Sequence, residues 1–126
     1  WTTSPDGSGG VAGPPSRTDH IVILAGHTIV INATNDNGST GVSPDGLNRP
    51  NVGTFAASGT ACFYQTGNIT VNAGGTLDVQ GRIIIENYTL INGNLTATGD
   101  IINLGKLTVN STAVLTSDDD LILTWE

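Results

Sequence analysis

Carboxylates are the residues of this chain that most readily suggest chemistry, and their densest group is Asp118-Asp119-Asp120. Adjacent carboxylates beside turn carbonyls supply the oxygen ligands that calcium prefers. The run lacks the spaced Asp and Gly pattern of recognised calcium loops, however, which favours a solvated acidic corner. We keep Asp118, Asp119 and Asp120 as a calcium candidate and otherwise predict no metal and no cofactor.

Cleavage of polysaccharides is a second possible chemistry, and it needs paired carboxylates or a carboxylate beside Arg or Lys. Asp78, Glu86 and Asp100 are available for it, but they are scattered among predicted strands and corners. His20 and His27 have no acidic or Cys partner arranged as a triad or as a metal-ligand set. We therefore predict that the protein is not an enzyme and has no catalytic residues.

Threonine is a third candidate, because Thr70, Thr89 and Thr108 recur at regular steps along the chain. An outward column of these side chains on successive strands would match a repeating ligand such as ice or a polysaccharide. Outward threonine is also ordinary strand surface, since branched side chains suit a pleated sheet. Glycan binding therefore stays open as an alternative.

Composition restricts both the fold and the partners of the chain. Of its 126 residues, 37% are hydrophobic and 12% charged, and four basic residues against eleven acidic ones leave a net charge of −7. So few cations cannot neutralise a phosphate backbone, which excludes nucleic acid as a partner. Abundant apolar residues with low charge indicate a folded domain, and their β-branched types favour β-structure. No apolar run approaches the roughly 18 residues of a membrane span, so we predict no membrane insertion.

The start of the chain and its cysteine content bear on the compartment. The sequence begins at Trp1 rather than at Met, which we interpret as a mature protein after signal-peptide removal. Cys62 is the only cysteine, so it can form neither an intramolecular disulfide nor a zinc site. We predict a secreted protein, located outside the cell or on a bacterial cell surface.

An internal repeat positions all of these residues. A first apolar segment recurs at equal steps along the chain, at 69–72, 88–91 and 107–110. A second and a third segment follow it in each repeat, at 77–79, 95–97 and 115–117 and at 82–85, 100–103 and 120–123. Apolar residues within each segment mostly alternate, as in a strand with one buried face.

Corners rich in Gly and Asn, such as Ala73-Gly74-Gly75 and Asn92-Gly93-Asn94, separate the segments. Three short strands and their corners describe one coil of a β-solenoid, in which successive coils stack in parallel about 4.8 Å apart. The sequence therefore predicts an all-β, single-domain parallel β-solenoid (β-helix) with about 19 residues and three short strands per coil.

We assign the whole chain, 1–126, to this one domain. Residues 1–32 form an N-terminal segment and a first coil, because His20–Asn32 reads as two strands around one Gly corner. Residues 33–60, rich in Gly, Asn and Ser, are predicted to protrude as a loop. Residues 61–126 hold the regular coils.

The segment Asp19–Val30, together with Asn68–Leu77 after a Cys-containing lead-in, resembles secreted surface proteins of the Bacteroidota that carry parallel β-helices. The resemblance covers most of the chain outside 33–60. It implies a β-helix, but it does not separate adhesins from surface-layer components or accessory parts of exported enzymes.

The ends of a solenoid expose an apolar cross-section unless something caps them. The sequence shows no cap after the last strand, so we predict head-to-tail assembly of copies into an extracellular structural filament or sheath. The alternative is a monomeric adhesin or carbohydrate-binding module of a larger secreted protein, with a glycan or cell-surface ligand. The predicted assembly interface comprises Trp1, Ile21, Ile23, Ile29, Ile31, Leu121, Leu123 and Trp125.

Overall fold

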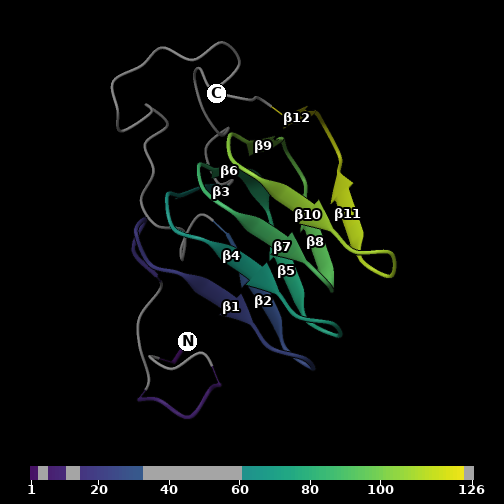
Figure 1. The fold of residues 1–126 in the computed structure, drawn as a ribbon. Helices are drawn as coiled ribbons and strands as arrows, with labels where there is room; N and C mark the ends of the chain where they lie inside the picture. The colour runs from purple at the N-terminus through teal and green to yellow at the C-terminus, as the bar shows by residue number, and fades with distance from the viewer. Residues whose placement is uncertain (3–5, 11–14, 33–60, 124–126) are drawn as a thin grey trace.

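The computed structural model describes residues 1–2, 6–10, 15–32 and 61–123, and these residues contain strands but no helix. Parallel strands stack in three sheets to form a β-solenoid of about three turns, with about 20 residues per turn (Figure 1). The predicted fold class is confirmed. Nothing in the described part of the chain is a helix long and apolar enough to span a membrane.

Each sheet contains four strands. We call a set of three consecutive strands, one from each sheet, a rung, and we number the rungs from the N-terminal end. Three turns therefore separate the first rung from the fourth. The first sheet contains β1 (Ile21–Ile23), β4 (Ile69–Val71), β7 (Thr89–Ile91) and β10 (Leu107–Val109). The second contains β2 (Thr28–Ile31), β5 (Thr76–Val79), β8 (Asn94–Ala97) and β11 (Val114–Ser117). The third contains β3 (Ala61–Gln65), β6 (Gly81–Ile85), β9 (Ile101–Asn103) and β12 (Leu121–Leu123).

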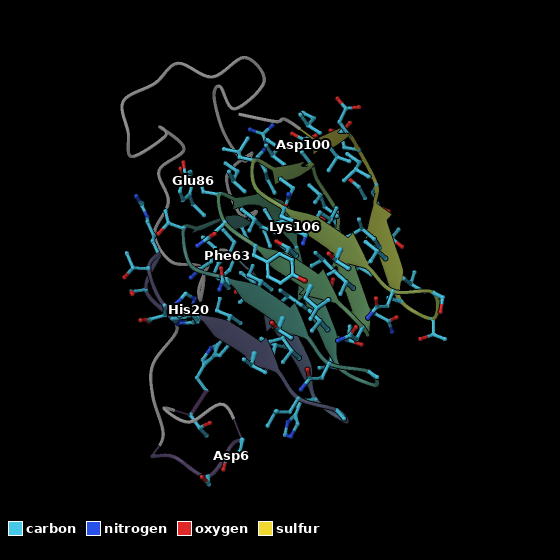
Figure 2. The ribbon with its side chains drawn as sticks, viewed as in Figure 1. Asp6, His20, Phe63, Glu86, Asp100 and Lys106 are labelled. Carbon is cyan, nitrogen blue, oxygen red and sulfur yellow. The ribbon has the colours of Figure 1, made fainter. Side chains whose placement is uncertain are left out.

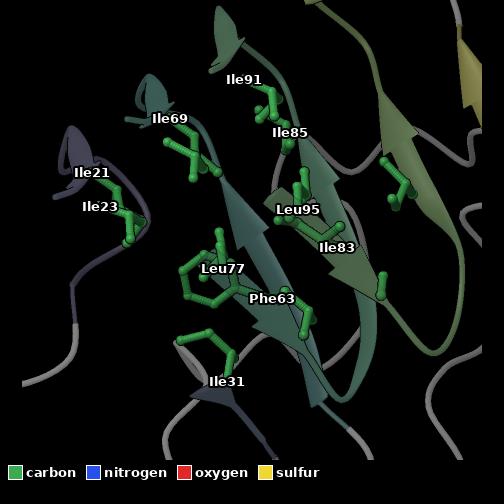
Figure 3. Packing of buried hydrophobic residues seen from close by; sticks show 14 of the residues in the cluster. Ile21, Ile23, Ile31, Phe63, Ile69, Leu77, Ile83, Ile85, Ile91 and Leu95 are labelled. Atoms are coloured by element: carbon green, nitrogen blue, oxygen red, sulfur yellow. The ribbon is translucent and has the colours of Figure 1, made fainter. Parts of the chain in front are cut away.

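The core lies inside the solenoid, where inward side chains of all three sheets meet. Alternate residues of a strand point to opposite faces, so Ile69 and Val71 are buried while Thr70 between them is half-buried. Phe63 of β3 is fully buried and packs among the branched aliphatic residues of the neighbouring strands (Figure 3). Burial of these side chains is the main stabilising contribution to the stack.

The predicted register is confirmed in the second and third sheets. Leu77 pairs with Leu95, and Leu95 with Leu115; the third sheet aligns Ile83 with Ile101 in the same way. Equivalent apolar residues therefore lie above one another from rung to rung.

In the first sheet the predicted register is wrong by one position. Ile69 pairs with Thr89 rather than with Tyr88, and Thr89 pairs with Leu107. In this sheet, the number of residues between paired positions is therefore larger than predicted from the second rung to the third, and smaller than predicted from the third rung to the fourth. The cause is the corner between the first and second sheets, which is reduced to Asn92–Gly93 in the third rung but spans 24–27, 72–75 and 110–113 in the others.

Glycine makes these tight corners possible. Gly26 and Gly74 have φ angles of 78° and 80° at this corner, a conformation that residues with a Cβ rarely adopt. A Cβ on Gly93 would collide with the carbonyl oxygens of Gly75 and Asn72 in the rung below. The shortened corner therefore requires glycine. The predicted loop, 33–60, lies outside the described residues.

Candidate functional site

The fourth rung exposes side chains that occupy inward positions. Leu121 is 48% exposed and Leu123 is 60% exposed, although their register partners Ile101 and Asn103 in the third rung are each 1% exposed. Val109 is exposed in the same way, although its register partner Ile91 in the third rung is fully buried. Within the described residues, no strand pairs with the outer edges of β10, β11 and β12. The C-terminal end of the described stack is therefore apolar, with unpaired strand edges.

The first rung, at the opposite end, is covered. Ile21, Ile23 and Ile31 are at most 3% exposed. Trp1 and Ile29 are half-buried and pack against the same core cluster. Of the predicted interface residues, Leu121 and Leu123 are thus exposed, while Ile21, Ile23 and Ile31 are buried. Trp125 lies outside the described residues.

The acidic corner Asp118–Asp120 lies between β11 and β12, on the rim of the exposed end. Carboxylate oxygens of Asp119, Asp120 and Asp100 lie within 4.8 Å of one another, and Asp118 is not in this group. Sequence reasoning missed the contribution of Asp100. The signal was present, because Asp100 and Asp120 each directly precede a strand of one register pair, β9 and β12.

Asp100 already has a cationic partner. Arg82 Nη2 lies 2.5 Å from Asp100 Oδ2, and the Asp100 side chain is 8% exposed against 20% for Arg82. The backbone N–H of Asp120 donates to Asp100 Oδ1 at 3.3 Å. The positive charge of the Arg82 guanidinium neutralises the Asp100 carboxylate, which makes this carboxylate a poorer ligand for a calcium ion. The residues Asp118–Asp120 therefore form an exposed, negatively charged corner.

The three carboxylates considered for catalysis have separate partners. Asp78 of β5 accepts a hydrogen bond from Thr96 Oγ1 at 3.0 Å, and Glu86 accepts one from the Tyr64 hydroxyl. Figure 2 labels Glu86 and Asp100, which follow β6 and precede β9 and so lie at different corners. The structure therefore does not assemble them into the paired arrangement that glycoside cleavage uses.

The two histidines are also apart. His20 Nδ1 accepts the backbone N–H of Asn68 at 2.9 Å, which joins the first rung to the second. His27 is exposed at the corner between β1 and β2. The contact of His20 is therefore a structural one between adjacent rungs.

The predicted threonine column is not formed. Thr70 pairs with Leu90, and Leu90 pairs with Thr108, so the outward column alternates between polar and apolar side chains. Thr89 faces the core and is fully buried. A shift of one position exchanges the two faces of a strand, and the short corner of the third rung produces that shift.

Comparison of the chain with the known protein families, with curated proteins and with solved structures found no match. What the structure establishes is a β-solenoid repeat fold. The resemblance to Bacteroidota surface proteins stays a prediction. One fold serves many functions, so the fold alone does not assign one, and the most distinctive feature of the described surface is the exposed fourth rung.

Proposed function

We propose that the chain is a non-enzymatic extracellular structural protein, of the Bacteroidota surface β-helix type, whose solenoid subunits associate through the exposed fourth rung. The observation that carries the proposal is the exposure of Leu121 and Leu123 at inward positions. Association would remove this apolar surface from water and pair the open strand edges, both of which favour assembly.

Head-to-tail stacking into a filament is one geometry for such an assembly. It would place the fourth rung of one copy on the first rung of the next. Because Ile21, Ile23 and Ile31 are covered, this geometry also requires the first rung to be uncovered before the next copy binds.

The test is the mass of the 126-residue chain in solution, measured by light scattering over a range of concentrations and paired with negative-stain electron microscopy. We expect species larger than the 12.9 kDa monomer. Leu123→Asp should return the protein to monomers, because a charge at this position would be buried without a partner in the contact. Thr116→Asp is the matched control, since Thr116 is exposed in the same rung.

A circular dichroism spectrum of each variant shows whether the β-structure is retained. A wild-type chain that stays monomeric at every concentration would contradict the proposal. That result would favour the binding-module alternative and make a glycan-binding screen the next experiment.

A further inference from the structure

We propose that two copies join fourth rung to fourth rung around a two-fold axis, which forms a closed dimer in which Lys106 of each copy faces the Asp118–Asp120 corner of the other. This inference rests on the proposed function and names its partner, a second copy of the chain. It differs from the filament because the contact uses the same end of both copies and leaves no free association surface.

The two ends of the described stack differ in exposure. Leu121 and Leu123 are exposed at the fourth rung, whereas Ile21, Ile23 and Ile31 are covered at the first. Contact between two fourth rungs buries exposed apolar side chains on both partners. Contact between a fourth and a first rung would meet an end that is already closed.

The position of the two-fold axis decides which strands meet. A two-fold axis across this contact can stand perpendicular to the face of any one of the three sheets. If the axis is perpendicular to the third sheet, β12 pairs with the β12 of the other copy in antiparallel orientation, and β10 meets β11. This choice places Leu121 and Leu123 at the centre of the contact and continues the third sheet through both copies.

The charges at the corners distinguish these three positions of the axis. The third sheet lies between two corners near this end, the acidic corner Asp118–Asp120 of the fourth rung and the corner 104–106, which leads from the third rung into the fourth and ends with the exposed Lys106. An axis perpendicular to the third sheet exchanges these corners, so that each lysine meets three carboxylates. An axis perpendicular to the first sheet would place the acidic corner against itself. An axis perpendicular to the second sheet would place Lys106 against itself.

Lys106 is free to make this contact. Within one chain its ammonium lies 5.5 Å from the centre of the Tyr88 ring, a contact on the outer surface of the solenoid. The side chain is exposed and flexible, so it can turn toward a carboxylate across the contact. Because each copy carries a net charge of −7, attraction at these corners also offsets the repulsion between the two chains.

The test is light scattering of the wild-type chain and of charge variants of both corners. The wild type should reach a limiting mass of about 26 kDa, twice the 12.9 kDa monomer, and grow no further. Lys106→Glu and Asp118→Lys should each weaken the dimer roughly three- to tenfold, because each change acts twice in a two-fold contact. The double variant should recover most of the loss, and Leu123→Asp should abolish the dimer while its β-spectrum persists.

Each other outcome has a distinct meaning. A mass that keeps growing with concentration and collapses in Leu123→Asp would overturn the two-fold dimer and leave the proposed function standing. A dimer that Leu123→Asp breaks but that ignores both charge variants would overturn the placement of the axis. A monomer at every concentration, or a dimer that survives Leu123→Asp, would overturn both the dimer and the proposed function.

Discussion

Thr89 and Asn103 are hydrogen-bonded to each other inside the solenoid, with 3.1 Å between the threonine Oγ1 and the asparagine Oδ1. Both side chains are buried, and Asn103 also donates to the Gly105 carbonyl at 2.7 Å. A buried acceptor that loses its donor stays desolvated without compensation. We therefore expect Thr89→Val to lower the free energy of unfolding by about 1–3 kcal/mol, measured by urea denaturation.

Thr70→Val is the control, because Thr70 occupies the half-exposed outward face of the same sheet. We expect it to change the free energy of unfolding by less than about 0.5 kcal/mol. Equal effects of the two substitutions would show that the buried hydrogen bond is not what stabilises the third rung.

A second prediction compares Ile101→Ala with Leu121→Ala, two substitutions at one inward column of the third sheet. Ile101 is 1% exposed, so its truncation should lower the free energy of unfolding by about 2–5 kcal/mol through the cavity that it leaves. Leu121 is 48% exposed, and in a dilute monomer its truncation should cost about 1 kcal/mol or less. Thermal unfolding at several protein concentrations measures both.

The Leu121→Ala effect should grow with protein concentration, because assembly through the fourth rung would bury that side chain. A cost that is independent of concentration would count against association through this end.

The third prediction concerns the short corner. Gly93→Ala should destabilise the chain by about 1–3 kcal/mol or more, because its Cβ would collide with the carbonyl oxygens of Gly75 and Asn72. At Gly26 a Cβ would meet open space, so Gly26→Ala should cost only the strain of its φ of 78°, about 1 kcal/mol. Denaturation midpoints of the two variants give the comparison. A larger loss for Gly26→Ala would mean that dihedral strain outweighs the collision at Gly93.

The fourth prediction concerns Arg82 and Asp100, which pair across two adjacent rungs. Asp100→Ala would leave the mostly buried guanidinium without this partner, and we expect it to lower the free energy of unfolding by about 1.5–3 kcal/mol. Since little of the pair is exposed, the loss should persist at about 1 M salt. Denaturation at two salt concentrations tests this.

Asp118→Ala is the comparison variant, because Asp118 is exposed at the rim of the same corner. It should change stability by less than about 0.5 kcal/mol. If high salt removed the Asp100→Ala loss, the pair would have to be far better hydrated than its burial implies.

Most of the fold was predictable from the sequence because inward positions are repeated. Leu77 and Leu95, and likewise Ile83 and Ile101, mark equivalent positions of successive rungs, and the structure pairs them as predicted. A repeated apolar residue is a reliable marker because each rung buries it against the same neighbours.

The register of the first sheet was harder to predict because its repeat is interrupted there. The equal steps of the sequence align Thr89 with Thr70, whereas the structure turns Thr89 into the core. Aligning Asn92–Gly93 with the longer corner of the rung below would have revealed that this corner is shortened. The hydrogen-bond partner of Thr89 was even harder to predict, because no local sequence pattern connects Thr89 with Asn103.

Of the candidate site, the apolar fourth rung was predictable and the covered first rung was not. The alternation of Leu121 and Leu123 in β12 marks inward positions, and within the described residues no strand pairs with the outer edge of β12. At the first rung, by contrast, Trp1, which is distant in sequence from β1 and β2, packs against the core cluster that contains Ile21, Ile23 and Ile31. Periodicity carries no information about such contacts.

The spacing of paired strands along the chain also sets an order of folding. Thr76 pairs with Asn94, which is near it in the sequence, whereas Ile21 pairs with Ile69 and the whole of 33–60 lies between them. The larger chain closure costs less than about 1 kcal/mol more, but it delays the encounter of the two strands. We expect the second to fourth rungs to form the nucleus in refolding experiments, and β1 and β2 to dock last. During synthesis the N-terminal strands would then wait for their partners, although they leave the ribosome first.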